Sequence, residues 1–204
     1  MQKVAQEYFK PENLTIVTRC PGLEKQQEER PEAQPESAQT RRMALPNGIV
    51  LLIREDHNVR SVHIQASFEG GVRYETPKTA GIGRVMAASV KRGTESRSRM
   101  QIARTLDSLG ASIGTLSGRN TFNVTAKTMP EHVDTVFGLL ADCVQNPIFP
   151  EGEIARVKAL KIAGLKAKED QPSQVASRML LKELFQEHSY GLDPDGTVDA
   201  INSI

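Results

Sequence analysis

The sequence lacks the features that most directly mark membrane, secreted and nucleic-acid-binding proteins. No apolar run approaches the ~18–20 residues that cross a bilayer. The first residues, MQKVAQEYFKPENL, carry charges throughout and so lack the apolar region of a signal peptide. An excess of charge of one sign is also missing, because 26 Lys and Arg stand against 25 Asp and Glu. We therefore expect no membrane and no nucleic acid as partner.

Cysteine is scarce. The two cysteines, Cys20 and Cys143, cannot build a disulfide framework or a four-thiolate zinc site. Cys143 lies in the apolar stretch LLADCV and is predicted to be a small core residue, whereas Cys20 precedes a Pro-Gly turn. Two cysteines do not decide the cellular compartment.

Motifs that carry chemistry are missing as well. No two of the four histidines have the i, i+4 spacing that places two imidazoles on one helix face. The phosphate loop G-x-x-x-x-G-K-[ST], the dinucleotide motif G-x-G-x-x-G and the nucleophile elbow G-x-S-x-G are absent. The four histidines are His57, His63, His132 and His188. The residues by themselves therefore predict no active site.

A change in composition divides the chain. Residues 24–42 have alanine as their only apolar residue type, so they cannot bury enough surface to offset the entropy of ordering. Before them, the branched residues LTIVT predict a strand that Pro21-Gly22 ends. The predicted parts are the tail of a preceding domain (1–22), a solvated linker (23–43) and a folded domain (44–204).

The folded domain begins with strands and continues with helices. MALPNGIVLLIRED predicts either a strand pair or a bent strand, with Asn47-Gly48 at the turn. A helix is predicted to begin at the Ser98-x-x-Gln101 capping box and to end at Gly110. Other expected elements are a strand that begins at Ser61 and is closed by Gly70-Gly71, a helix with Arg84 in it, two strands over 111–128, and helices over 130–144, 151–168 and 173–186. This order predicts an α+β fold with helices packed on one face of a largely antiparallel sheet.

Apolar spacing predicts which residues of these elements face the core. The expected inward residues are Val62, Ile64, Ala66 and Phe68 in the strand, Ile82, Val85, Met86 and Val90 in the next helix, and Val133, Val136, Phe137 and Leu140 in a later one. The last stretch, YGLDPDGTVDAINSI, has no obvious closing element. We therefore expect the chain to continue in a longer protein at both ends.

From Leu45 onward the chain resembles the M16 metallopeptidases, the pitrilysin, insulinase and mitochondrial processing peptidase group. The stretches that match occur in the family's order. They are LPNGIVLLI, FEGGVRYETPKTAGIG, VKRGT, LDSLGASIGTLSGRNTFNVTA, LLADCVQNPIFPEGEIARVK and KEDQPSQVASRMLLKELFQEHSYG. The resemblance implies the fold shared by the processing peptidases and LuxS. VAQEYFKPENLTIVTRCPG also resembles the end of an M16 half, which implies two M16 halves in tandem.

Family members that cleave peptides carry the inverted zinc motif H-x-x-E-H. Its two histidines bind zinc from one helix face, its glutamate polarises the attacking water, and a glutamate on a later helix is the third ligand. Alignment on Gly93-Thr94 without gaps places these four roles at Arg84, Ala87, Ala88 and Gly164. Guanidinium has no lone pair to offer a cation, and alanine and glycine have no side-chain donor. We therefore expect no catalytic residue, no metal ligand and no cofactor in this domain.

The resemblance implies a role for such a domain. M16 peptidases close two related halves around a peptide, and the half without zinc helps to enclose and bind the substrate. The expected partners are therefore a zinc-bearing half upstream in the same parent protein and a peptide substrate. The alternative is a structural subunit similar to the core proteins of the cytochrome bc1 complex. Arg84 would meet either an acidic substrate group or an internal partner.

The compartment is not decided by these residues. The composition of the linker and the tandem arrangement suggest a bacterial protein, and tandem peptidases of this kind are often exported to the periplasm.

Overall fold

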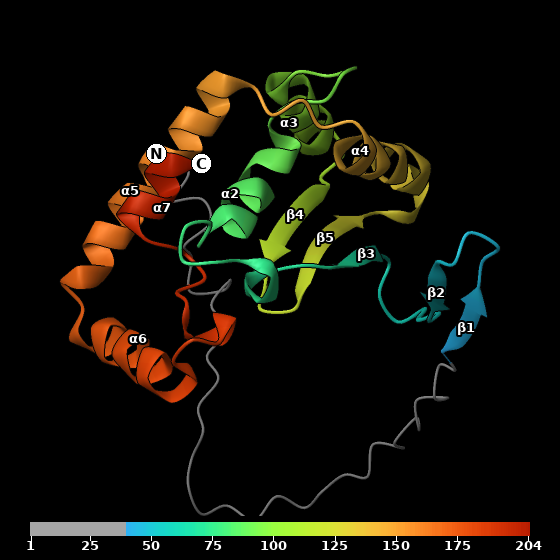
Figure 1. Ribbon diagram of the computed structural model, residues 1–204. Coiled ribbons are helices and arrows are strands. Elements are labelled where there is room, and N and C mark those ends of the chain that lie inside the picture. The colour runs from blue at the N-terminus through green and yellow to red at the C-terminus, as the bar shows by residue number, and fades with distance from the viewer. Residues whose placement is uncertain (1–39) are drawn as a thin grey trace, which may run out of the picture. The chain divides into compact units, whose positions relative to one another are not determined.

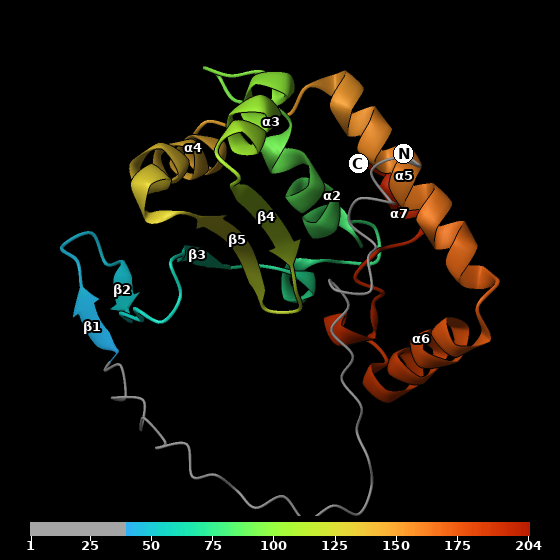
Figure 2. The same cartoon turned by 180° about the vertical axis from the view of Figure 1, so that it is seen from behind.

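The computed structural model describes residues 40–204 (Figures 1 and 2). The chain divides into two compact units, Met1–Asp56 and His57–Ile204, and each is described by itself. The predictions for residues 1–22 and for nearly all of the linker lie outside the described residues. In the described part of the chain, no helix is both long enough and apolar enough to span a membrane.

The first unit contributes a β-hairpin. Strand β1 (Arg41–Ala44) pairs antiparallel with β2 (Val50–Ile53). The Gly48 N–H donates to the Leu45 carbonyl at 2.9 Å, and Gly48 has φ +84°. A positive φ is the reason why glycine is favoured at this turn position. The predicted strand pair with its turn at Asn47-Gly48 is confirmed, and β1 begins within the stretch predicted as linker.

A three-stranded antiparallel sheet forms the centre of the second unit. Its strands β3 (Val62–Glu69), β4 (Ser112–Ser117) and β5 (Thr121–Thr128) lie in the order β3-β5-β4. The register places Ile64 of β3 and Ile113 of β4 on either side of Ala126. Because alternate residues of a strand share a face, these three apolar residues lie on the same side of the sheet as Val124.

Three helices cover that apolar side: α2 (Ile82–Ser89), α3 (Arg99–Ser108) and α4 (Val133–Gln145) (Figure 1). Ser98 and Gln101 form the predicted capping box at the start of α3. The core between helices and sheet is built from Ala87, Val90, Ile102, Leu106, Ile113, Phe122, Val124, Ala126, Val136, Leu139, Leu140 and Cys143. The predicted α+β fold with helices on one face of an antiparallel sheet is therefore confirmed.

The last helices form a second layer beside α2. Helix α5 (Glu151–Glu169) packs against α2 and against α7 (Val198–Ser203), around Val85, Val157, Leu165 and Ile201. Helix α6 (Pro172–Phe185) buries no residue fully. Figure 2 shows α5 running alongside α2. The helices predicted over 130–144, 151–168 and 173–186 are confirmed, whereas α7 was not predicted.

Four residues predicted to face the core are exposed instead. They are Phe68 in β3, Ile82 and Met86 in α2, and Phe137 in α4. Helix α2 packs against two neighbours: Ala87 is buried in the core with the sheet, and Val85 is buried against α5. The small Ala87 is therefore buried where a larger apolar residue was predicted to be. The row formed by Ile82 and Met86, one turn apart, then faces outward.

Candidate functional site

The N-terminal end of α2 is fixed by Glu75. The Glu75 carboxylate accepts hydrogen bonds from the Gly81 N–H at 2.7 Å and the Gly83 N–H at 3.0 Å. These are donors that the first turn of a helix leaves unpaired, and a negative charge there also favours the helix dipole. At Gly81, with φ +91°, a Cβ would lie 2.7 Å from the carbonyl oxygen of Asp195. The start of α2 is therefore packed closely against the loop before α7.

Arg84 projects from α2 toward that loop. Its Nη1 lies 2.5 Å from Oδ1 of Asp195. Of the two partners considered for Arg84, the internal one is present. Ala88 follows one turn later on the same face of the helix. Ala87 points elsewhere, because it is buried in the main core and its carbonyl accepts a hydrogen bond from Thr115 Oγ1 at 2.5 Å.

Asp195 is the centre of a charged cluster between α2, α5 and the loop before α7. Besides Arg84, it contacts Lys161, whose Nζ lies 3.3 Å from Oδ1, and Lys168, which bonds Oδ2. Burial alone would raise the pKa of Asp195. The hydrogen bonds from Arg84 and Lys168 and the charges of Arg84 and Lys161 outweigh burial and hold this pKa well below its ordinary value. Asp195 is therefore ionised at neutral pH.

A cavity beside this cluster brings two of the aligned positions together. Ala88 of α2 and Gly164 of α5 both line a space of about 390 Å³, which also has Lys161, Lys168 and Asp195 in its wall. A Cβ placed on Gly164 would meet no atom within 4 Å. The small residues at positions 88 and 164 therefore leave open space between the two helices.

The residues at these positions do not fit a zinc ion. Zinc in proteins is bound by thiolate, imidazole or carboxylate. Ala87, Ala88 and Gly164 offer none of these, and the charge of Arg84 repels a cation. Across residues 40–204, no group of three or more His, Cys, Asp or Glu is placed to hold a metal ion. We therefore derive no zinc-dependent step for this domain.

The K-R-G-T segment after α2 is held by a second carboxylate, Asp142 of α4. It accepts hydrogen bonds from Thr94 at 2.7 Å and Ser96 at 2.8 Å, and pairs with Arg97 at 2.7 Å. Hydrogen bonds from Asn146, Thr94 and Ser96 hold the pKa of Asp142 well below its ordinary value. This cluster fixes the end of α2 against α4 and has a structural role.

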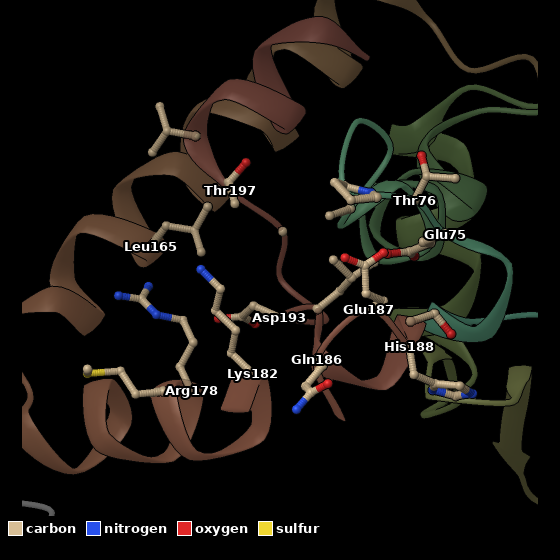
Figure 3. A pocket seen from close by; sticks show the side chains of 18 of the residues that line it. Glu75, Thr76, Leu165, Arg178, Lys182, Gln186, Glu187, His188, Asp193 and Thr197 are labelled. Carbon is tan, nitrogen blue, oxygen red and sulfur yellow. The ribbon is translucent and has the colours of Figure 1, made fainter. Parts of the chain in front are cut away.

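A larger hollow of about 830 Å³ adjoins the charged cluster (Figure 3). It lies between α5, α6 and the segment 75–80. In Figure 3 the side chains of Arg178 and Lys182 rise from α6 toward Leu165 of α5, and Glu75 and Thr76 belong to the opposite wall. The hollow shares Leu165 with the cavity beside Gly164, so the two spaces neighbour each other along α5.

The sequence did not indicate Asp195, Lys161 or Lys168. Asp195 lies in the stretch 190–204, for which no element was predicted. Two signals were present there: Asp-Pro-Asp-Gly is typical of a turn, and Thr197 accepts the Ala200 N–H as the N-cap of α7. The pairing of Asp195 with Arg84, far apart in the sequence, had no local signal.

Comparison with known proteins gives one consistent result. A model of the family described as "Insulinase (Peptidase family M16)" matches residues 50–195. An uncharacterized zinc protease of Bacillus subtilis is 28% identical over 163 residues, which are 80% of this chain and 40% of that protein. This chain thus spans about 40% of the length of that curated relative.

Two solved structures share the fold. A peptidase M16 inactive domain from Pseudomonas fluorescens matches with a TM-score of 0.77 and 22% identity, over 81% of this chain and 40% of that one. A protease from Helicobacter pylori matches with a TM-score of 0.75 and 15% identity, over the same shares of the two chains.

Proposed function

Because the chain belongs to the insulinase family, peptidase family M16, we propose that it is an inactive peptidase domain that helps to enclose and bind peptide substrate. In this proposal the zinc-bearing half is elsewhere in a parent protein, and residues 1–22 and 23–43 are the tail of that half and the linker from it. The domain itself carries no zinc and does not cleave peptides.

One observation carries the proposal. The helix pair that presents the family's zinc ligands is retained, but every aligned ligand position lacks a lone pair for a metal. Arg84 is engaged by Asp195, and Ala88 and Gly164 leave a cavity. The solved Pseudomonas fluorescens protein with this fold is itself described as an inactive M16 domain, which supports the same interpretation.

The length of the relatives supports the need for a partner. This chain matches about 40% of the Bacillus subtilis zinc protease and of the Pseudomonas fluorescens structure. A domain of this size provides one wall of a peptide chamber, and the other wall has to come from a second domain. The hollow of about 830 Å³ beside α6 is a surface that such a chamber would use.

The test is hydrolysis of a quenched fluorescent peptide by the parent protein, with and without residues 45–204. We expect the intact parent to cleave and the deletion variant to lose activity. Adding the separately purified 204-residue chain to the deletion variant should restore part of the activity. This result would show that the deletion removes one wall of the peptide chamber and does not cause the rest of the parent protein to misfold. The 204-residue chain alone should not cleave, with or without added zinc.

Other outcomes have clear meanings. Equal cleavage by the deletion variant would contradict a role in building the chamber. If neither form cleaves, the structural role similar to the cytochrome bc1 core proteins gains support. Hydrolysis by the 204-residue chain alone would contradict the assignment of an inactive domain.

A further inference from the structure

Positive charge is in excess around Asp195. Arg84, Lys161 and Lys168 place three positive charges around one carboxylate, so two of them have no negative charge in the cluster. The side chains of the three cations are 31%, 28% and 34% exposed, whereas that of Asp195 is 12% exposed. The carboxylate is therefore covered, and the cations are open to an approaching group.

The other charges that line the two smaller cavities around Asp195 do not remove the excess. Arg92 lines the cavity too, but it is paired with Glu153 at 3.1 Å. Arg178 and Asp193 both line the narrower space next to Asp195, and their charges offset each other. The surplus of two positive charges remains when these neighbours are counted.

The cluster also has more hydrogen-bond donors than acceptors. A lysine ammonium has three N–H donors, and among residues 40–204 Lys161 and Lys168 each make one hydrogen bond, to Asp195. In the described part of the chain, Nε of Arg84 is buried without a hydrogen-bond partner. One carboxylate therefore does not satisfy these three cations, and a second acceptor would be stabilised beside them.

Space for a second acceptor exists next to the donors. The cavity of about 390 Å³ is open because Ala88 and Gly164 have little or no side chain, and both lysines line it. The hollow of about 830 Å³ shares Leu165 and offers a mostly apolar wall beyond the cluster. If the two lysines bind an acceptor group, the hollow thus has room for the rest of the ligand molecule.

We infer that this cavity binds a carboxylate of a peptide, an inference that rests on the peptide-binding role proposed above. In active members of the family these aligned positions bind a metal cation. In this proposal the same region of this chain binds an anion instead. Lys161 and Lys168 donate hydrogen bonds to the carboxylate of the peptide. Arg84 remains paired with Asp195 and contributes its positive charge to the electrostatic potential of the site. The peptide that fits is one with an Asp or Glu side chain, or one whose C-terminal carboxylate reaches the cavity.

The test compares three dye-labelled short peptides of one sequence by fluorescence anisotropy with the 204-residue chain at low ionic strength. The first has one internal Glu and an amidated C-terminus, the second has Gln and a free C-terminus, and the third has Gln and an amide. We expect a carboxylate peptide to bind about tenfold more tightly than the third peptide, because charge-assisted hydrogen bonds are the strong ones. The preference should shrink as salt screens it.

The outcomes separate the two ideas. Tighter binding of the first peptide identifies a side chain as the ligand, and tighter binding of the second identifies the C-terminus. Equal binding of all three would overturn the anion site and leave peptide binding intact. No binding of any peptide would overturn the anion site and the proposed peptide-binding role together.

Matched variants locate the site. Lys161→Gln and Lys168→Gln each leave Asp195 with two cations, and each should reduce the carboxylate preference by about threefold to tenfold. Lys166→Gln removes the same charge from an exposed position of α5 and should keep the preference. An equal loss in Lys166→Gln would show a general charge effect and overturn the assignment. If a lysine variant fails to fold, the peptide comparison with the unaltered chain still decides.

Discussion

Replacing Asp195 by asparagine tests whether the charged cluster holds the domain together. Asparagine keeps the size of the side chain but leaves Arg84, Lys161 and Lys168 without a negative partner. Removing one partner of a buried ion pair costs about 3–5 kcal/mol, whereas exposed pairs contribute about 0–1 kcal/mol. Because the three cations are about one third exposed and regain hydration, we expect a loss of about 2 kcal/mol in the free energy of unfolding at pH 7.

The effect of Asp195→Asn should also depend on pH in a defined direction. The folded pKa of Asp195 is lowered relative to an unfolded aspartate, which titrates near about pH 3.9. A lowered pKa gives stability that is fully present above the unfolded pKa and is lost as the pH falls toward the folded pKa. The difference between the original chain and the variant should therefore be constant from pH 7 to about pH 5 and shrink below about pH 4.

Urea unfolding followed by circular dichroism measures both effects, since the sequence has no tryptophan for fluorescence. Asp107→Asn is the matched control, because Asp107 is exposed on α3 and has no ion pair in the described structure. It should change stability by no more than about 0.5 kcal/mol. The reasoning is refuted if Asp195→Asn is as stable as the original chain at pH 7, or if its deficit is unchanged at low pH.

Three further substitutions, each measured by urea unfolding, test the interactions that fix the N-terminal ends of α2 and α3. Gly81→Ala should cost about 2–4 kcal/mol, because it combines a positive φ with a Cβ that meets the backbone of Asp195; a neutral result would contradict the close packing there. Glu75→Gln should cost about 1–3 kcal/mol, since the Gly81 and Gly83 N–H groups bond to different carboxylate oxygens and glutamine replaces one of these oxygens by an NH2 donor; unchanged stability would mean that the cap is unimportant. Ser98→Ala should cost about 1 kcal/mol by removing the N-cap of α3, and a cost near zero would speak against the capping box.

The elements of the second unit followed from local patterns. Alternation in VHIQASFE predicted β3, and the Ser98 capping box with Gly110 bounded α3, because both signals act between neighbouring residues. What failed was the choice of buried residues. Met86 and Phe137 are large and apolar but exposed, whereas the small Ala87 is buried, because spacing gives an apolar face without saying which neighbour covers it.

The sequence predicted the position of the candidate site, but it did not predict the ion pairs that form there. Alignment on the K-R-G-T segment named Arg84, Ala88 and Gly164, and the structure brings Ala88 and Gly164 to one cavity. The acceptor of Arg84 was not predicted, because Asp195 reaches it through the packing of α2, α5 and α7 rather than through any spacing in the sequence. The sequence therefore predicts which family ligands are replaced, whereas the pairing of Arg84 with Asp195 is visible only in the fold.

The charged cluster gives a physical reason why the helix pair persists without metal ligands. A metal held from positions 84 and 88 of α2 and position 164 of α5 would cross-link the two helices. In this chain Asp195 makes a link between the same two helices, because it binds Arg84 of α2 and both Lys161 and Lys168 of α5. An ionic link of this kind requires a cationic residue on each helix. Two of these cations, Lys161 and Lys168, line the cavity that Gly164 leaves open. In our proposal, the groups that stabilise the helix pair without metal therefore also give the cavity its preference for an anion.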